Sequence, residues 1–308
     1  MSKTVFLFPG QGAQSVGMGK DFYDEFQIAK DTYHKADEIL KYSISQLCFE
    51  GPNEELTQTI NSQPAIYTTS WVIWEVLKSL GKISVSSESQ FAGLSLGEFS
   101  AHSACGTWQF EDGLRLVQKR AEAMQKAAES TDGTMASVLN LDVNTIDEIC
   151  KNIDGIVQSA NYNISSQIVI SGETAAVEEA SKKLLEAGAK RVIPLSVSGA
   201  FHSPLMASAE SALSEAFDSV SLSETESKVY SNVSASAVTN VEDVKETVVG
   251  QLTSPVRWYQ TMEKLIDLGY TNFIELGPNK VLTGLMRRIN KEIKVINIKE
   301  VTDLEKLN

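Results

Sequence analysis

The sequence is poor in the residues that build disulfide scaffolds, metal centres and membrane spans. It has only three histidines and three cysteines, and no CxxC or His/Cys cluster indicates a metal site. No apolar run approaches the roughly 20 residues that cross a bilayer, and the N-terminus lacks the long apolar core of a signal peptide. We therefore expect a cytoplasmic protein that binds no metal. The cysteines are Cys48, Cys105 and Cys150.

The sequence also has fewer basic than acidic residues. Lys and Arg number 27 against 40 Asp and Glu, so the formal net charge is −13 over 308 residues. Such a protein repels polyanions, so nucleic acid and anionic membrane surfaces are not expected as partners. The 42% of hydrophobic residues is ordinary for a globular chain that buries a large core. The length favours two domains, or one large domain that carries an insertion.

Short apolar runs alternate with helical patterns along most of the chain. This order predicts an α/β fold, with a mostly parallel, helix-covered sheet of hydrolase-like type in the large domain. Between 130 and 197 the order changes to β-α-β-β-α-β, which predicts an inserted ferredoxin-like subdomain. The large domain would then consist of 1–129 and 198–308. Within the first part, Gln63-Pro64-Ala65 predicts a chain break before a helix at 66–80.

A candidate nucleophile lies in the stretch 90–99, QFAGLSLGEF. Gly93-Leu94-Ser95-Leu96-Gly97 matches the Gly-x-Ser-x-Gly pattern, in which a serine occupies a sharp strand-to-helix turn. The turn exposes the hydroxyl and directs backbone N–H groups toward an oxyanion. The alternative is an ordinary turn whose serine caps the helix. A second glycine-containing loop, 9–14, is not a dinucleotide fingerprint, because Pro9 opens it and its glycine spacing is wrong.

A serine hydroxyl needs a base to become a nucleophile, and the three histidines can be compared. His34 lies on a polar helical stretch and is expected at the surface. His102 follows Ser95 by two helical turns, too far to reach its hydroxyl. His202 lies in the loop where the chain returns from the insertion, so it is the candidate base, the alternative being a loop histidine bonded to backbone. No acidic residue stands out as a third member, so a backbone carbonyl could orient the imidazole instead.

An arginine lies on the apolar face of the helix expected at 111–128. Leu116, Val117, Arg120 and Met124 share that face by their i, i+3 and i+4 spacing. A buried guanidinium requires an anion. It either forms an internal ion pair or holds a substrate carboxylate at two points. Beside a serine that carries an acyl group, the second interpretation predicts a dicarboxylic acyl group.

Several separated motifs, in order along nearly the whole chain, resemble the bacterial malonyl-CoA:acyl carrier protein transacylases. The same catalytic fold serves as the acyltransferase domain of polyketide synthases. Leu94 departs from the pattern, because many members have histidine there. The motifs are 8–14 (FPGQGAQ), 93–98 (GLSLGE), Arg120 with Met124, 161–163 (NYN), 167–172 (QIVISG), 199–203 (GAFHS), 231–233 (SNV), Gln251 with 255–258 (PVRW), and 275–278 (ELGP).

The resemblance implies transfer of a malonyl group from malonyl-CoA to the phosphopantetheine thiol of acyl carrier protein, for fatty-acid synthesis. It implies a monomer without a cofactor beyond these two substrates. The roles it implies are Ser95 as acyl carrier, His202 as base, the amides of Gln11 and Leu96 as oxyanion hole, Arg120 with Met124, Asn161 and Phe201 at the substrate, and the carbonyl of Gln251 as the group that orients His202.

Three other functions remain open from the sequence. A serine esterase or thioesterase would use the same turn at 93–97, the nucleophile elbow. Arg120 and the lack of an acidic residue to orient His202 do not favour this alternative. An acyltransferase that serves a polyketide synthase would have the same catalytic fold, and the sequence does not distinguish the two pathways. A non-catalytic protein that binds carrier proteins would form no acyl adduct on Ser95.

Overall fold

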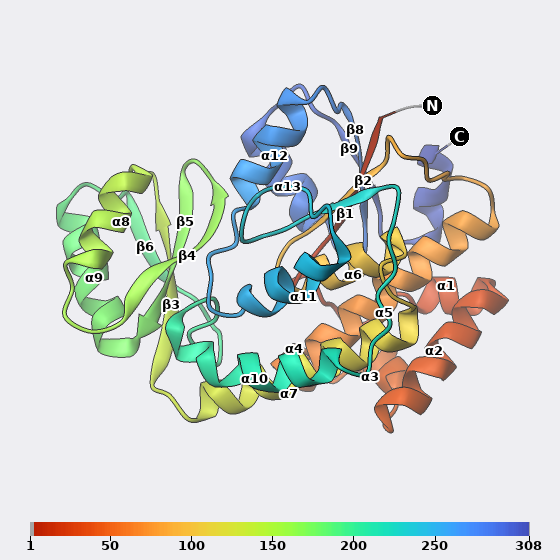
Figure 1. Cartoon of the computed structure of the whole chain (residues 1–308), viewed down its shortest axis with the longest axis horizontal. Coiled ribbons are helices and arrows are strands. Elements are labelled where there is room, and N and C mark those ends of the chain that lie inside the picture. The colour runs from red at the N-terminus through yellow and green to blue at the C-terminus, as the bar shows by residue number, and fades with distance from the viewer. Residues whose placement is uncertain (1–2, 308) are drawn as a thin grey trace.

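The computed structural model describes residues 3–307 and contains two separate sheets (Figure 1). The larger sheet is parallel throughout, in the strand order β7-β2-β1-β8-β9. All five residues of β1 are buried, as expected for a strand with helices on both faces. The strands of the larger sheet are β1 (Thr4–Phe8), β2 (Gln90–Gly93), β7 (Lys228–Tyr230), β8 (Asn272–Leu276) and β9 (Val295–Ile298).

Alternate residues of β1 face two different cores. Phe6 and Phe8 pack into the core that α5, α6 and α7 help to form, whereas Val5 and Leu7 pack against α12 and α13. None of the described helices is long and apolar enough to span a membrane. The helices around this sheet are α1 (Lys20–Glu25), α2 (Gln27–Leu40), α3 (Ile44–Glu50), α4 (Asn53–Thr57), α5 (Thr59–Ser79), α6 (Leu96–Cys105), α7 (Phe110–Glu129), α10 (Ala207–Phe217), α11 (Val241–Gly250), α12 (Trp258–Asp267) and α13 (Val281–Ile289).

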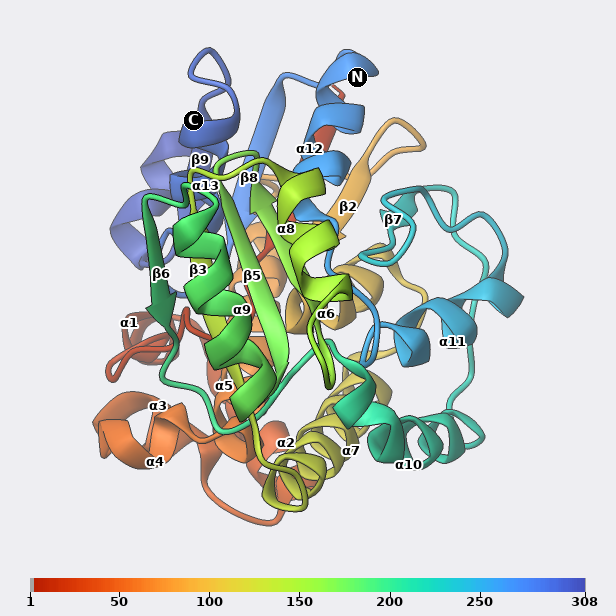
Figure 2. The ribbon, with the colours of Figure 1, turned by 90° about the vertical axis from the view of Figure 1, so that its left-hand side faces the viewer.

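The smaller sheet has a core of its own and lies at the other end of the molecule, in front in Figure 2. It is antiparallel, in the order β4-β5-β3-β6, the ferredoxin-like arrangement. The α/β fold with its second, antiparallel sheet is therefore confirmed. The elements of this part are β3 (Gly133–Leu139), α8 (Val143–Lys151), β4 (Val157–Ile164), β5 (Gln167–Glu173), α9 (Thr174–Glu186) and β6 (Arg191–Pro194).

The predicted chain break at Gln63-Pro64-Ala65 is wrong, because Pro64 lies inside α5. A proline there removes one backbone hydrogen bond of the helix. Most residues of α5 from Thr59 to Leu77 are buried, and this packing maintains the helix despite the loss. A second helix boundary lies at Phe26, which is extended (φ −117°, ψ 126°) and separates α1 from α2.

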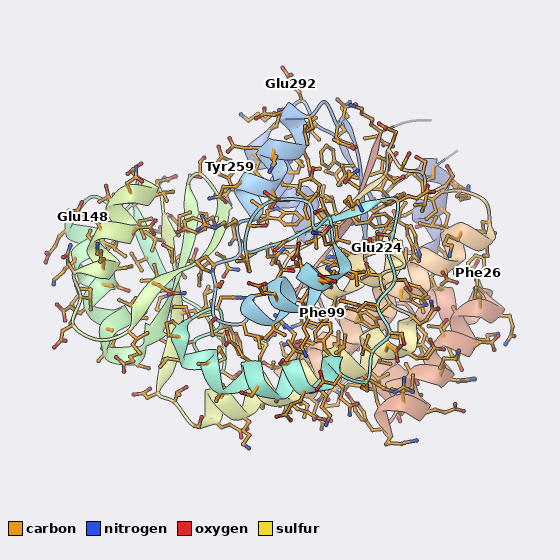
Figure 3. The ribbon with its side chains drawn as sticks, in the orientation of Figure 1. Phe26, Phe99, Glu148, Glu224, Tyr259 and Glu292 are labelled. Atoms are coloured by element: carbon orange, nitrogen blue, oxygen red, sulfur yellow. The ribbon has the colours of Figure 1, made fainter. Side chains whose placement is uncertain are left out.

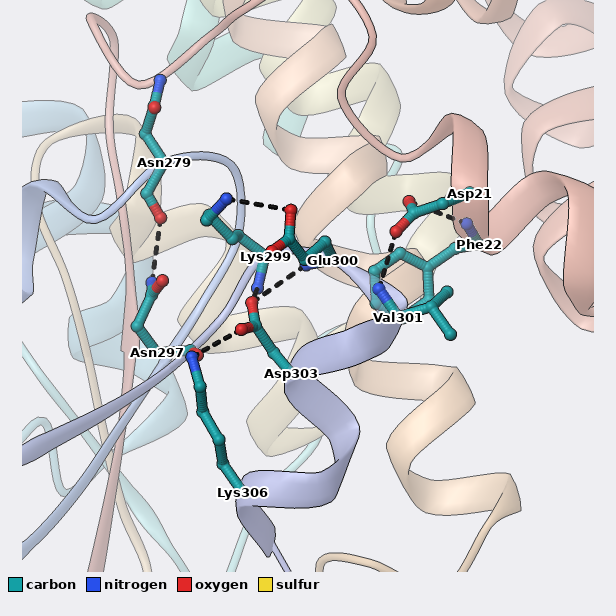
Figure 4. A network of polar contacts seen from close by, with 9 residues as sticks. All are labelled: Asp21, Phe22, Asn279, Asn297, Lys299, Glu300, Val301, Asp303 and Lys306. Carbon is teal, nitrogen blue, oxygen red and sulfur yellow. Dashed lines mark hydrogen bonds and ion pairs between the residues drawn. The ribbon is translucent and has the colours of Figure 1, made fainter.

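The C-terminal turn, η2 (Val301–Leu307), is attached to the N-terminal part of the chain by a polar network (Figure 4). The carboxylate of Asp21, in α1, accepts a hydrogen bond from the backbone N–H of Val301 at 2.6 Å. Asp303 accepts from the backbone N–H of Lys299 at 3.0 Å, and Lys306 forms an ion pair with Asp303. These contacts hold the end of β9 in place. This strand forms the edge of the larger sheet that lies away from β2.

Candidate active site

Ser95 occupies the turn between β2 and α6, at the carboxyl edge of the parallel sheet. Its backbone has φ 54° and ψ −107°, a conformation that non-glycine residues rarely adopt. A Cβ on Gly93 would lie 1.9 Å from the backbone of Gly97, and one on Gly97 would lie 2.0 Å from the oxygen of Phe8. The two glycines are therefore required for this turn to pack. Ser95 makes no side-chain capping bond to α6, which removes the helix-cap alternative.

His202 lies directly against the hydroxyl of Ser95. Its Nε2 is 2.8 Å from Ser95 Oγ, and its Nδ1 is 2.8 Å from the backbone oxygen of Gln251. Because a carbonyl oxygen can only accept, Nδ1 carries the proton and Nε2 presents a lone pair to the serine hydroxyl. Burial lowers the pKa of His202 to about 4, and the nearby positive charge of Arg120 acts in the same direction. The imidazole is therefore neutral at pH 7 and able to accept a proton.

Arg120, on α7, is buried and also contacts Ser95. Its Nη2 donates to Ser95 Oγ at 3.0 Å and to Gln251 Oε1 at 2.8 Å, and Nη1 donates to Gln63 Oε1 at 2.7 Å. The guanidinium lies 5.3 Å above the ring of Phe99, which is labelled in Figure 3. Its Nε has no hydrogen-bond partner in the part of the chain that the structure describes.

No carboxylate among residues 3–307 forms an ion pair with Arg120; its described polar partners are neutral oxygens. The internal ion pair considered from the sequence is therefore absent from the described residues. Burial lowers the pKa of Arg120, and the nearby Glu98 opposes this shift. A buried cation whose partners are neutral is suited to an incoming anion.

The two candidate oxyanion donors lie on adjacent turns. Gln11 follows β1 and Leu96 is the first residue of α6. A Cβ on Gly10 would lie 2.2 Å from the oxygen of Leu94, so the two turns are in direct contact. The side chain of Gln11 donates to Thr59 Oγ1 at 3.2 Å, which holds its loop against α5. Two N–H groups on neighbouring turns at one edge of the sheet can serve one oxyanion.

The other residues predicted at the substrate lie outside the hydrogen-bonded group that Ser95, His202, Arg120 and Gln251 form. Met124 is buried, and its sulfur accepts a hydrogen bond from Gln63 Nε2 at 3.5 Å. Phe201 is buried beside His202. Asn161, on β4, pairs with Val256 in an isolated bridge between the smaller sheet and the larger part. None of the described polar contacts joins Asn161 or Phe201 to Ser95, so the structure does not bring these two into the hydrogen-bonded group.

The family model described as "Acyl transferase domain" matches residues 5–306. The chain belongs to this family.

Individual members resemble the chain over nearly its whole length. A malonyl CoA-acyl carrier protein transacylase of Bacillus subtilis is 44% identical over 308 residues, covering 99% of this chain and 96% of that protein. The structure of an acyl carrier protein S-malonyltransferase from Vibrio cholerae is 36% identical, covers 100% of both chains and has a TM-score of 0.95. A malonyl-transacylase solved in complex with its type II polyketide acyl carrier protein is 35% identical, covers 99% of both chains and has a TM-score of 0.94.

Sequence reasoning missed three residues of this acyl transferase site. Gln63 was assigned to a chain break, yet it lies in α5 and bonds Arg120. Asn232 and Glu98 lay within recognised motifs but received no role. All three are polar side chains that are completely or almost completely buried. A polar residue among apolar neighbours in the sequence was the only local sign that these side chains are buried. Leu94 packs against the core on the α12 and α13 side.

Proposed function

We propose that the chain transfers a malonyl group from malonyl-CoA to the phosphopantetheine thiol of acyl carrier protein, through an ester on Ser95. The observation that carries this proposal is the position of Ser95 Oγ, 2.8 Å from a neutral imidazole and 3.0 Å from a buried guanidinium. The imidazole can activate the hydroxyl, and the guanidinium can bind a free carboxylate on the acyl group. The similarity to a malonyl CoA-acyl carrier protein transacylase and to an acyl carrier protein S-malonyltransferase supports the same reaction.

In the first half-reaction, Ser95 Oγ attacks the thioester carbonyl while His202 Nε2 takes its proton. The carbonyl oxygen becomes an oxyanion that the N–H groups of Gln11 and Leu96 stabilise. The C–S bond then breaks, and His202 returns the proton to the departing thiolate of CoA. Gln251 accepts from Nδ1 throughout, so it keeps the imidazole in the tautomer that this transfer requires.

The second half-reaction repeats these steps with a different thiol. His202 takes the proton of the phosphopantetheine thiol, the sulfur attacks the ester on Ser95, and the proton returns to Ser95 Oγ as the C–O bond breaks. Arg120 holds the terminal carboxylate in both halves. The chemistry as proposed uses only side-chain and backbone groups of this chain, the thioester malonyl-CoA and the phosphopantetheine thiol, without a cofactor or metal. We further propose that the protein acts as a cytoplasmic monomer that supplies fatty-acid synthesis, and its free Cys48, Cys105 and Cys150 fit a reducing compartment.

Mass spectrometry of the intact protein after brief exposure to malonyl-CoA tests this proposal. We expect one malonyl adduct that maps to Ser95 and that disappears when phosphopantetheinylated acyl carrier protein is added, with malonyl-carrier protein as product. Rapid repeated release of CoA without carrier protein would instead indicate a thioesterase. Absence of any adduct would indicate a binding protein without acyl transfer activity.

A further inference from the structure

Glu98 is a buried carboxyl group that the reaction steps above do not use. It lies one turn after Ser95 on α6 and is completely buried. Its Oε2 accepts hydrogen bonds from the backbone N–H of Asn232 at 3.2 Å and from Nε2 of Gln251. Its Oε1 has no hydrogen-bond partner among residues 3–307. A buried carboxyl with one unsatisfied oxygen is costly, so its retention calls for a physical reason.

The two partners of Glu98 both hold the backbone of Ser95. Asn232 Oδ1 accepts from the N–H of Ser95 at 2.6 Å, and Gln251 Nε2 donates to the carbonyl oxygen of Ser95 at 3.1 Å. Ser95 has a positive φ, and such a conformation persists only where its surroundings determine it. Both backbone polar groups of the strained residue are thus bonded to side chains of two residues that donate to one carboxyl oxygen, Asn232 through its backbone N–H and Gln251 through its side-chain amide.

Gln251 extends the same arrangement to Arg120. An amide side chain has one donor end and one acceptor end. Because Nε2 donates to Glu98 and to Ser95, Oε1 is directed toward Arg120 Nη2, 2.8 Å away. With the amide reversed, a donor would face the guanidinium and the bond would be lost.

We propose that Glu98 is a positioning residue whose Oε2, through Asn232 and Gln251, fixes the backbone of Ser95 and the direction of the Arg120 guanidinium. This inference rests on the proposed function. Glu98 acts as a hydrogen-bond acceptor at a set distance and not as a base. Burial raises the pKa of its carboxyl well above the usual range, against the opposing bonds from Gln251 and Asn232 and the charge of Arg120. Oε2 can accept both bonds in either protonation state, so the role does not depend on the negative charge.

Two substitutions separate the acceptor from the charge. Glu98→Gln keeps the length and an acceptor oxygen but cannot ionise, whereas Glu98→Asp keeps an ionisable carboxyl and withdraws the oxygen by one methylene. Glu275 offers a matched control, because this buried carboxyl accepts from the backbone N–H groups of Leu282 and Thr283 in α13, and none of its described hydrogen bonds involves Ser95. The measurement is the single-turnover rate of Ser95 acylation against malonyl-CoA concentration, with thermal melting of each variant.

We expect Glu98→Gln to acylate within about tenfold of the unsubstituted protein, because neutral hydrogen bonds are about half as strong as charged ones. Glu98→Asp should lose on the order of 10²-fold in rate, since a displacement near 1 Å can cost that much, and should also need more malonyl-CoA for half-saturation. Glu275→Asp should melt at a lower temperature and acylate at the normal rate. If Glu98→Asp does not fold, Glu98→Met has the same expectation.

Three results would overturn the positioning role: full activity of the Asp or Met variant, an equal loss in the Gln and Asp variants, or an equal loss in Glu275→Asp. The proposed function is tested separately by the unsubstituted protein. If that protein forms no adduct on Ser95, the proposed function fails, whereas a normal adduct with full activity of Glu98→Asp refutes only the role of Glu98.

Discussion

The guanidinium of Arg120 donates a hydrogen bond to Ser95 Oγ at 3.0 Å, so a buried cation lies beside the hydroxyl that we propose carries the acyl group. The contact serves two stages of the reaction. Before acylation, the positive charge favours the oxyanion character that Oγ acquires as His202 removes its proton. After acylation, Oγ is an ester oxygen, and the same guanidinium can bind the terminal carboxylate of the acyl group.

Removal of this cation should change which acyl group the protein accepts. In Arg120→Ala, kcat/KM for malonyl-CoA should fall by on the order of 10²- to 10³-fold, because loss of one partner of a buried charge pair costs about 2–5 kcal/mol. Activity with acetyl-CoA should fall less, so the ratio of acetyl to malonyl transfer should rise. Parallel assays with the two thioesters measure this ratio. An unchanged ratio would refute the carboxylate-binding role.

The pH dependence of acylation should reflect the pKa of His202. The imidazole accepts a proton only when neutral, so the rate should fall as the pH is lowered through about 4, where burial places its pKa. Removal of the nearby positive charge makes protonation easier. The acid limb of Arg120→Ala, measured with acetyl-CoA, should therefore lie at higher pH than that of the unsubstituted protein. An acid limb at the same pH in both proteins would show that Arg120 does not act on His202.

The free energy of unfolding should also depend on pH through buried His102. Burial lowers its pKa to about 3, whereas an unfolded histidine has a pKa of about 6.5. Between these values the unfolded chain binds more protons than the folded one, so the free energy of unfolding falls as the pH is lowered through this window. His102→Gln should weaken that dependence between pH 7 and pH 4, measured by urea unfolding. A dependence as steep as that of the unsubstituted protein would assign the effect to other groups.

Two glycine substitutions in helices should have opposite effects. An alanine Cβ at Gly97 would lie 2.0 Å from the backbone oxygen of Phe8, so Gly97→Ala should cost at least about 1–3 kcal/mol of stability and displace the elbow. At Gly284, in α13, no described atom beyond the adjoining residues and the backbone of the helix itself lies within 4 Å of the added Cβ. Gly284→Ala should instead gain up to about 1 kcal/mol from helix propensity. Chemical unfolding and acylation rates of both variants check this contrast, and a harmless Gly97→Ala would contradict the close packing of the two turns.

The sequence predicted the parts of this protein that local patterns encode. The glycines around Ser95 indicated a strained turn, and the change in strand order near 130 indicated a second sheet. Gln63 was missed because a proline beside it was read as a helix break, whereas tertiary packing maintains α5 through that position. The contact of Asn232 with Ser95 spans 137 residues along the chain, and no local pattern encodes which side chain reaches the elbow from that distance. Comparison of motifs, more than periodicity, led to Gln11 and Gln251.

The central claim is that a cation across from the serine matches the free acid of the acyl group. A crystal structure of the protein trapped as its malonyl ester tests it most directly. We predict an ester on Ser95 Oγ, with its carbonyl oxygen toward the N–H groups of Gln11 and Leu96 and its carboxylate within hydrogen-bond distance of the Arg120 guanidinium. An ester on another residue, or a carboxylate directed into solvent while Arg120 keeps its bonds to Gln63 and Gln251, would contradict the claim.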